Sequence, residues 1–204
     1  ESLEHVYPRQ ILQEIFSYFK IPFPPEFLED LIEEWGTIML QNPPKLKKAI
    51  KPVLGDLSPN YQISLISDTG ITEGEVIREV FRNYGILQYF DVMVFSDEIG
   101  IKKPNLKPFQ KVLNELNVRS DEVIHIGDLL HTDILGANRA GCFSVWYADE
   151  YVDSNEQKQS LENFNIPDKH HLKPDYTIRS HEEIFKILNR SEERRVGKEC
   201  ATGC

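Results

Sequence analysis

The stretch of residues 123–137 constrains the fold of this chain more than any other. It begins as a short, mainly apolar run typical of a buried parallel strand, breaks at Gly127-Asp128, and resumes as a helix that carries Asp133. Open α/β sheets bind their ligands at such strand-to-helix turns. Two carboxylates there offer the hard oxygen ligands that suit Mg²⁺. Alternatively, neither residue has a functional role. Asp128 then ends the strand in a turn, and Asp133 lies in the first turn of the helix, where the helix dipole favours an acidic side chain.

Composition limits the partners that this chain can have. Its 204 residues, 40% of them hydrophobic, are enough for one domain with its own core and a small appendage. The formal net charge of −10 argues against a nucleic acid or an anionic membrane as partner. No apolar run is long enough to span a bilayer, and no signal-peptide pattern opens the chain. The oligomeric state is left open.

The three cysteines predict neither a disulfide framework nor a metal cluster. Cys142 lies in an apolar part of the sequence, where it is expected to be a small buried side chain, and Cys200 and Cys204 lie in a polar tail. We therefore expect a protein of the reducing cytoplasm.

Both ends of the chain need separate treatment. Residues 190–204 lack any periodicity and resemble the translation of a sequencing-adapter oligonucleotide, so we expect a non-native tail there. This tail carries four basic and three acidic residues, and without it the net charge is −11. The chain does not begin with Met, and we expect the native N-terminus to lie upstream of Glu1.

Two amphipathic helices are predicted near the N-terminus. Apolar side chains recur at helical spacing over residues 9–20 and again from about residue 26 to Met39, with a proline cluster at residues 22–25 between them. The two helices indicate a small helical module over residues 1–44. Its aromatic side chains either line a substrate pocket or form the core of the module itself.

From residue 45 to residue 189 strands and helices alternate. Apolar runs bounded by turn residues predict strands at 61–66, 92–95, 123–127 and 143–147, with a last short edge strand at 176–178. Helical patterns fill most of the intervals. The repeated strand-then-helix order predicts an α/β fold with a doubly wound parallel sheet.

Polar residues follow three of these strands in series. Ser67 follows the first, Lys103 lies in the loop after the second, and Asp128 with Asp133 follows the third. In a parallel sheet these ends share one edge and can converge on one ligand. A hydroxyl with turn amides, an ammonium group and a metal-binding acid pair are what a phosphoryl group requires. Taken singly, Ser67 is more often a turn residue and Lys103 a surface lysine.

The series gives a set of candidate site residues. Ser67 and Lys103 are the candidate catalytic residues, Ser67, Asp68, Thr69 and Lys103 the candidate substrate-binding residues, and Asp128 and Asp133 the candidate ligands of Mg²⁺.

These motifs resemble those of the haloacid dehalogenase-like hydrolase superfamily. The resemblance rests on Ser67-Asp68, on Lys103-Pro104-Asn105, and on Gly127-Asp128 with Asp133, Gly136-Ala137 and Gly141, and the later Lys173-Pro174-Asp175-Tyr176 is also similar. It covers residues 45 to 188, and the predicted helical pair is similar to the α-helical cap of the family. The resemblance implies a Rossmannoid phosphatase that uses Mg²⁺ and an aspartyl-phosphate intermediate to act on a small phosphorylated metabolite. Ser67 would match the second motif, Lys103 the third, and Asp128 with Asp133 the fourth.

One motif of the superfamily has no counterpart here. The family carries its nucleophile and its general acid/base on a central apolar strand that ends in Asp-x-Asp, and residues 1–8 contain nothing like it. The resemblance therefore implies that the central first strand is missing, which leaves either an open slot between residues 61–66 and 123–127 or a direct pairing of the two. Truncation upstream is the preferred explanation, and the chain as printed should then be inactive. A catalytically inactive binding protein is the alternative, and a haloacid dehalogenase ranks lower because that branch dispenses with metal.

Overall fold

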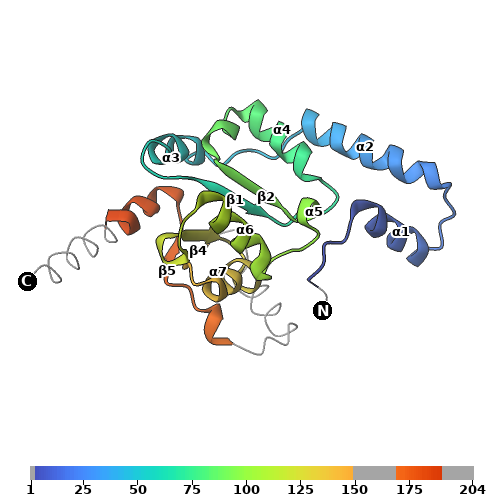
Figure 1. Cartoon of the computed structure of the whole chain (residues 1–204). Helices are drawn as coiled ribbons and strands as arrows, with labels where there is room; N and C mark the ends of the chain where they lie inside the picture. The colour runs from blue at the N-terminus through green and yellow to red at the C-terminus, as the bar shows by residue number, and fades with distance from the viewer. Residues whose placement is uncertain (1–2, 149–168, 190–204) are drawn as a thin grey trace, which may run out of the picture.

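The computed structural model describes residues 3–148 and 169–189 (Figure 1). The helices are α1 (Pro8–Tyr18), α2 (Pro25–Gln41), α3 (Ile50–Leu57), α4 (Gly74–Tyr84), α5 (Ser96–Ile99), α6 (Leu106–Leu116) and α7 (Leu135–Ala140), and residues 184–189 are also helical. The strands are β1 (Ser64–Ser67), β2 (Val92–Phe95), β3 (Ile124–Gly127), β4 (Phe143–Tyr147) and β5 (Tyr176–Ile178). Short helical turns are η1 (Leu87–Tyr89), η2 (Ser120–Glu122), η3 (Leu130–Ile134), η4 (Lys169–Leu172) and η5 (His181–Glu183).

The strands form two parallel sheets. β1 pairs with β2, and in the other sheet β4 lies between β3 and β5. All three pairings are parallel, as the alternation of strands and helices predicts. Within residues 3–148 and 169–189 no strand joins β1 to β3, so the two sheets stay separate. The open slot expected from the missing first strand is present, and the direct pairing is not.

Hydrogen bonds identify the open edge of β1. The carbonyl of Ile63 accepts a bond of 2.8 Å from the Asp91 N–H, on the side of β2. Because the backbone groups of successive strand residues point to opposite sides, those of Ile66 point away from β2. The Ile66 carbonyl is bound there by the Lys103 ammonium, at 3.0 Å. Lys103 therefore lies on the side of β1 where another strand would pair.

β3 has an open edge of the same kind. The carbonyl of Val123 accepts a bond of 2.9 Å from Phe143 N–H, on the side of β4. By the same alternation the backbone groups of Ile124 and Ile126 point to the other side. The side chain of Ile126 is 38% exposed, which is unusual for an isoleucine in the middle of a strand.

Helices cover both faces of the sheets. On one face α3 and the last helix pack against β4 and β5, in a cluster around Val53, Val145 and Ile184. On the other face α6 and α7 pack together around Phe109 and Ala137, and both Ile66 of β1 and the residues leading into β3 contact this cluster. The layer of α6 and α7 therefore spans both sheets, which confirms the doubly wound α/β architecture.

The predicted N-terminal helices are present as α1 and α2, which project from the sheets in Figure 1. Phe16 contacts Phe23 and Phe27 with ring centroids 5.0 and 6.0 Å apart, so part of the aromatic content forms the contact between the two helices. Tyr18 and Phe19 are largely exposed. The division into a helical module at residues 1–44 and a core at residues 45–189 stays a prediction, and the expected non-native tail at residues 190–204 lies outside the described residues. None of the described helices is both long enough and apolar enough to cross a bilayer.

Candidate active site at the carboxyl ends of β1 and β3

An ion pair between Lys103 and Asp133 lies at the centre of the candidate site. The Lys103 Nζ is 2.6 Å from Asp133 Oδ1 and 3.0 Å from the Ile66 carbonyl, and both side chains of the pair are almost completely buried. Lys103 lies in the loop between α5 and α6, while Asp133 lies in η3, after β3. The ammonium group therefore bridges the two sheets near the carboxyl ends of β1 and β3. On β1 it binds the carbonyl of Ile66, the residue before Ser67.

The environment of Asp133 keeps its carboxyl ionised. Burial alone would raise the pKa of Asp133, but the neighbouring side chains of His125 and Lys103 outweigh burial and hold this pKa far below its ordinary value. His125 Nε2 lies 3.5 Å from Asp133 Oδ1. The other oxygen, Oδ2, accepts a bond of 3.0 Å from Leu129 N–H. Sequence reasoning missed His125, although a histidine inside an otherwise apolar strand was the available signal.

The backbone around Asp133 differs from the predicted α-helix. η3 is a π-helical turn, and α7 begins only at Leu135. A turn of this kind is a local widening of the helix that is often found at functional sites. Here it brings the carboxylate back against Gly127, where an added Cβ would overlap the Asp133 side chain. Gly127 is therefore required for the close approach of Asp133 to the end of β3.

The loop after β1 lies beside this pair. Ser67 is the last residue of β1, and Asp68 Oδ1 accepts a bond of 3.0 Å from the backbone N–H of Lys103. The loop of residues 67–70 and the loop that carries Lys103 are thus joined directly. Of the predicted site residues, the structure brings Asp68, Lys103 and Asp133 together, with Ser67 next to them in the chain.

Thr69, a predicted substrate-binding residue, donates its hydrogen bonds within the protein. Its backbone N–H donates to Ser96 Oγ at 2.8 Å, and its hydroxyl donates to Asp97 Oδ1 at 2.8 Å. Both donors of Thr69 are therefore used to fasten the loop to α5. Sequence spacing could not reveal this, because Ser96 and Asp97 lie 27 and 28 residues further along the chain.

Asp128 directly follows β3 and is exposed. Its backbone carbonyl accepts a bond of 3.0 Å from Trp146 Nε1, which fixes the backbone of the turn. Asp128 is the more exposed carboxylate of the predicted metal pair, and both oxygens of Asp133 accept hydrogen bonds from the protein.

The donor set at this edge is compatible with Mg²⁺. Mg²⁺ prefers oxygen ligands and uses one or two carboxylates together with water and substrate phosphate. Asp128 offers such a carboxylate, and Asp133 follows five residues later in η3. Among the described residues, no cluster of three or more His, Cys, Asp or Glu side chains could hold a metal ion. The two carboxylates predicted to hold the metal, those of Asp128 and Asp133, offer oxygen atoms alone.

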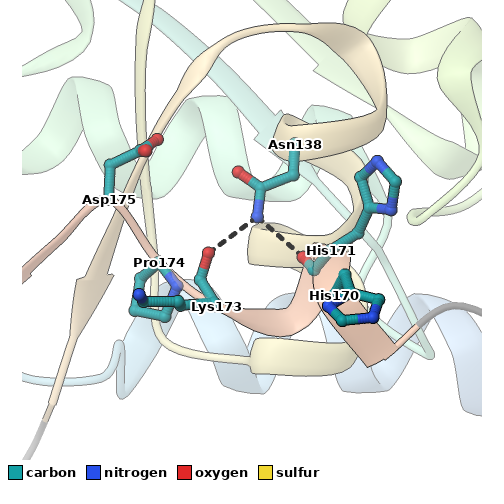
Figure 2. Close-up of a pocket in the computed structure, with 6 residues that line it drawn as sticks. All are labelled: Asn138, His170, His171, Lys173, Pro174 and Asp175. Carbon is teal, nitrogen blue, oxygen red and sulfur yellow. Dashed lines mark hydrogen bonds between the residues drawn. The ribbon is translucent and has the colours of Figure 1, made fainter.

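A separate cavity lies between α7, η4 and the loop that precedes β5 (Figure 2). It has a volume of about 410 Å³ and is lined by Asn138, His170, His171, Lys173, Pro174 and Asp175. Asn138 Nδ2 donates to the carbonyls of His171 and Lys173, at 2.7 and 3.0 Å, and so holds the loop that leads into β5. Asp175 directly precedes the first residue of β5, so this cavity is at the amino end of the strands, away from Lys103.

A family model identifies the chain over most of its length. The model of the haloacid dehalogenase-like hydrolase family matches residues 6–147. A glyceraldehyde 3-phosphate phosphatase of Methanothermobacter thermautotrophicus is 31% identical over 119 residues, which are 57% of this chain and 51% of that protein. A pyrimidine 5'-nucleotidase of Escherichia coli is 30% identical over 129 residues, 56% of each chain. A glyceraldehyde 3-phosphate phosphatase of Methanopyrus kandleri is 40% identical over 77 residues, 37% of this chain and 33% of that protein. The chain thus spans between a third and just over half of the length of these relatives.

Solved structures share the fold. A HAD phosphatase from Thermococcus onnurineus aligns with a TM-score of 0.59 and 24% identity, over 86% of this chain and 69% of that one. A HAD-hydrolase of Bacillus subtilis bound to magnesium aligns with a TM-score of 0.67 and 17% identity, over 89% of this chain and 70% of that one. At these identities the likeness concerns the fold alone.

Proposed function

Because this chain belongs to the haloacid dehalogenase-like hydrolase family, we propose that its site serves the Mg²⁺-dependent hydrolysis of a small phosphorylated metabolite through an aspartyl-phosphate intermediate. The observation that carries the proposal is the buried Lys103 ammonium. It is held between the Ile66 carbonyl and the Asp133 carboxylate, and Ser67 follows Ile66 in the chain. A fixed positive charge near a serine hydroxyl and the backbone N–H of Asp68 is suited to the equatorial oxygens of a phosphoryl group.

Each residue has a distinct proposed task. The Ser67 hydroxyl and the Asp68 N–H hold phosphoryl oxygens, and the Lys103 ammonium offsets their negative charge. Asp128 holds Mg²⁺, which on binding would neutralise charge on the phosphate. Asp133 orients Lys103 through their ion pair and supports Asp128 at the proposed metal site.

The aspartyl-phosphate intermediate requires a nucleophilic aspartate near Lys103. None of the strands in the described residues ends in Asp-x-Asp. The open edge between β1 and β3 is where such an aspartate would lie, because Lys103 already occupies that edge at the Ile66 carbonyl. We propose that the nucleophile comes from a strand that occupies this edge, and that the chain as printed does not turn over substrate.

The substrate is proposed only as a class. The relatives are named for glyceraldehyde 3-phosphate and for pyrimidine nucleotides, and another, from Halalkalibacterium halodurans, is named a pyrophosphatase. All are small phosphorylated molecules. The proposed partner is therefore a small phosphorylated metabolite, with neither nucleic acid nor membrane involved.

The test uses a version of the chain extended at its N-terminus by an apolar strand that ends in Asp-x-Asp. Leu3 lies beside Lys102, so the added segment starts close to the site. We expect this version to hydrolyse an aryl phosphate in the presence of Mg²⁺. Asp128→Asn should lower the rate at least about a hundredfold, since it removes an anionic ligand from a hard cation.

Asp121→Asn is the matched control, because Asp121 pairs with Arg119 on the surface and should leave the rate unchanged. Hydrolysis that survived both Asp128→Asn and EDTA would rule the proposal out.

A binding protein without turnover is the second candidate. It is favoured by the absence of Asp-x-Asp at the end of any described strand. It would replace the first proposal if the extended version bound phosphorylated ligands with Mg²⁺ but released no phosphate.

A further inference from the structure

The N-terminal segment is fastened to the core beside the candidate site. His5 N–H donates to the Gly100 carbonyl, and Lys102 N–H donates to the Leu3 carbonyl, both at 2.9 Å. Residues 3–5 therefore run antiparallel to residues 100–102, with an isolated bridge between Glu4 and Ile101. α1 begins at Pro8, three residues after His5. This short pairing fixes the point at which the α1–α2 pair leaves the core.

The His5 side chain extends this attachment to the loop of residues 67–70. His5 is only 6% exposed, and its Nδ1 lies 3.0 Å from Ser96 Oγ. The same Ser96 oxygen accepts the Thr69 N–H at 2.8 Å and lies 3.1 Å from the Thr69 hydroxyl. Ser96 is itself 2% exposed. A continuous buried relay of hydrogen bonds thus runs from the segment before α1 to the loop after β1.

The second ring nitrogen of His5 weakens the attachment. Nε2 is buried and has no hydrogen-bond partner among the described residues. Burial lowers the pKa of His5, while Asp97 and Asp68 oppose this effect and Lys102 adds to it, so the docked ring is neutral near pH 7. A buried nitrogen without a partner is unfavourable, and it regains hydrogen bonds with water once the ring leaves. The buried, unpaired nitrogen therefore makes the docked position of His5 less stable.

The α1–α2 pair has few other buried contacts that would hold it in place. In α1 only Pro8 and Leu12 are buried, and in α2 only Leu28. Trp35 Nε1 donates to Thr72 Oγ1 at 2.9 Å, which attaches α2 to the loop after β1. Elements with so little buried surface move relative to a core more readily than the core itself changes.

We propose that His5 is a positioning residue that couples the place of the α1–α2 pair to the conformation of the loop of residues 67–70. With His5 docked, Ser96 Oγ is held where it accepts the Thr69 N–H, and the loop keeps the Ser67 hydroxyl and the Asp68 N–H beside Lys103. When the helical pair moves outward and withdraws His5, Ser96 loses a partner and the loop loosens. The coupling rests on the proposed function, in which this loop binds phosphate.

The test measures hydrogen–deuterium exchange of the peptide that contains Thr69, in the 204-residue chain, with and without inorganic phosphate. In His5→Leu we expect the Thr69 amide to exchange about tenfold faster, because its acceptor is no longer held. The affinity for inorganic phosphate should fall several-fold. His5→Asn, whose amide can still reach Ser96, should restore both values to within about twofold. His170→Leu, which changes an exposed histidine in η4, is the matched control and should alter neither.

A second variant separates the relay from the fold. Ser96→Ala should accelerate exchange at Thr69 as His5→Leu does, and the double variant should be no faster than Ser96→Ala alone. Unchanged exchange at Thr69 in both single variants would overturn the proposal, even if one of them folded poorly. If the unaltered chain failed to bind phosphate, the proposed function would be in error, while the exchange at Thr69 would still decide the role of His5.

Discussion

At the scale of single residues, the candidate site depends on how closely Asp133 approaches the end of β3. Lys103 and His125 both contact Asp133 Oδ1, and Leu129 N–H contacts Oδ2, so the carboxylate has one orientation. That orientation is possible only because residue 127 has no side chain. The glycine of the Gly-Asp motif is thus a steric requirement of Asp133, which lies five residues beyond Asp128.

The requirement predicts the effect of Gly127→Ala. A Cβ at this position would overlap Cβ and Cγ of Asp133, so either the strand end or η3 must shift. We expect a loss of about 1–3 kcal/mol in the free energy of unfolding, the usual range for overpacking, together with weaker phosphate binding. Urea denaturation at neutral pH measures the first quantity.

Gly70→Ala serves as the control for this change, because a Cβ at Gly70 would meet no atom within 4 Å. Equal stability of the two alanine variants would show that Asp133 is not held as described.

At the scale of elements, sequence periodicity predicted the order of strands and helices but not their local detail. α1, α2, α6 and the strands β2 to β5 lie where the apolar patterns indicate, because each buries one face or both. β1 is displaced by a few residues from the predicted 61–66, and Asp133 lies in a π-helical turn instead of an α-helix. Such shifts are set by tertiary contacts, here the packing of Asp133 against Gly127, which no local pattern encodes.

In the candidate site, too, the general arrangement was predictable from the sequence and the local contacts were not. The common edge of Asp68, Lys103 and Asp133 followed from the parallel order of the strands. The partners of Thr69 did not, because the predicted turn gave no reason for its donors to turn toward α5. The contact between His5 and Ser96 was also hidden, because the two residues lie 91 positions apart in the sequence.

The Lys103-Pro104-Asn105 motif also caps the N-terminus of α6. Asn105 is the N-cap of α6, and its side-chain oxygen accepts the Lys107 N–H at 2.9 Å. Asn105→Ala should therefore lower the free energy of unfolding by about 1 kcal/mol, the usual loss of such a cap. Thermal or urea unfolding measures it.

Asn114→Ala, at an exposed position inside the same helix, should be neutral or slightly stabilising because alanine is the better helix former. If the two variants were equally stable, Asn105 would not act as a cap, and its place in the motif would need another explanation.

At the scale of the whole molecule, the gap between the two sheets governs stability. β1 and β3 each lack a partner on one side within the described residues, and only the Lys103 ammonium takes up one of the carbonyl groups on that side. Unpaired parallel edges of this kind recruit other strands and favour aggregation. A strand of about five residues in the gap would complete both ladders and cover Ile126, which could add several kcal/mol, comparable to the stability of a domain.

A strand supplied in trans should therefore stabilise the chain. We expect an apolar peptide of about six residues that ends in Asp-x-Asp to raise the unfolding temperature in proportion to the logarithm of its concentration, because it binds only the folded state. The same peptide with a central proline should have no effect, since proline cannot complete the ladder. Without a peptide, residues 1–189 should aggregate more readily as their concentration rises than they do with it. Cooperative unfolding of a soluble monomer of these residues, with no response to either peptide, would show that the gap is closed by other means.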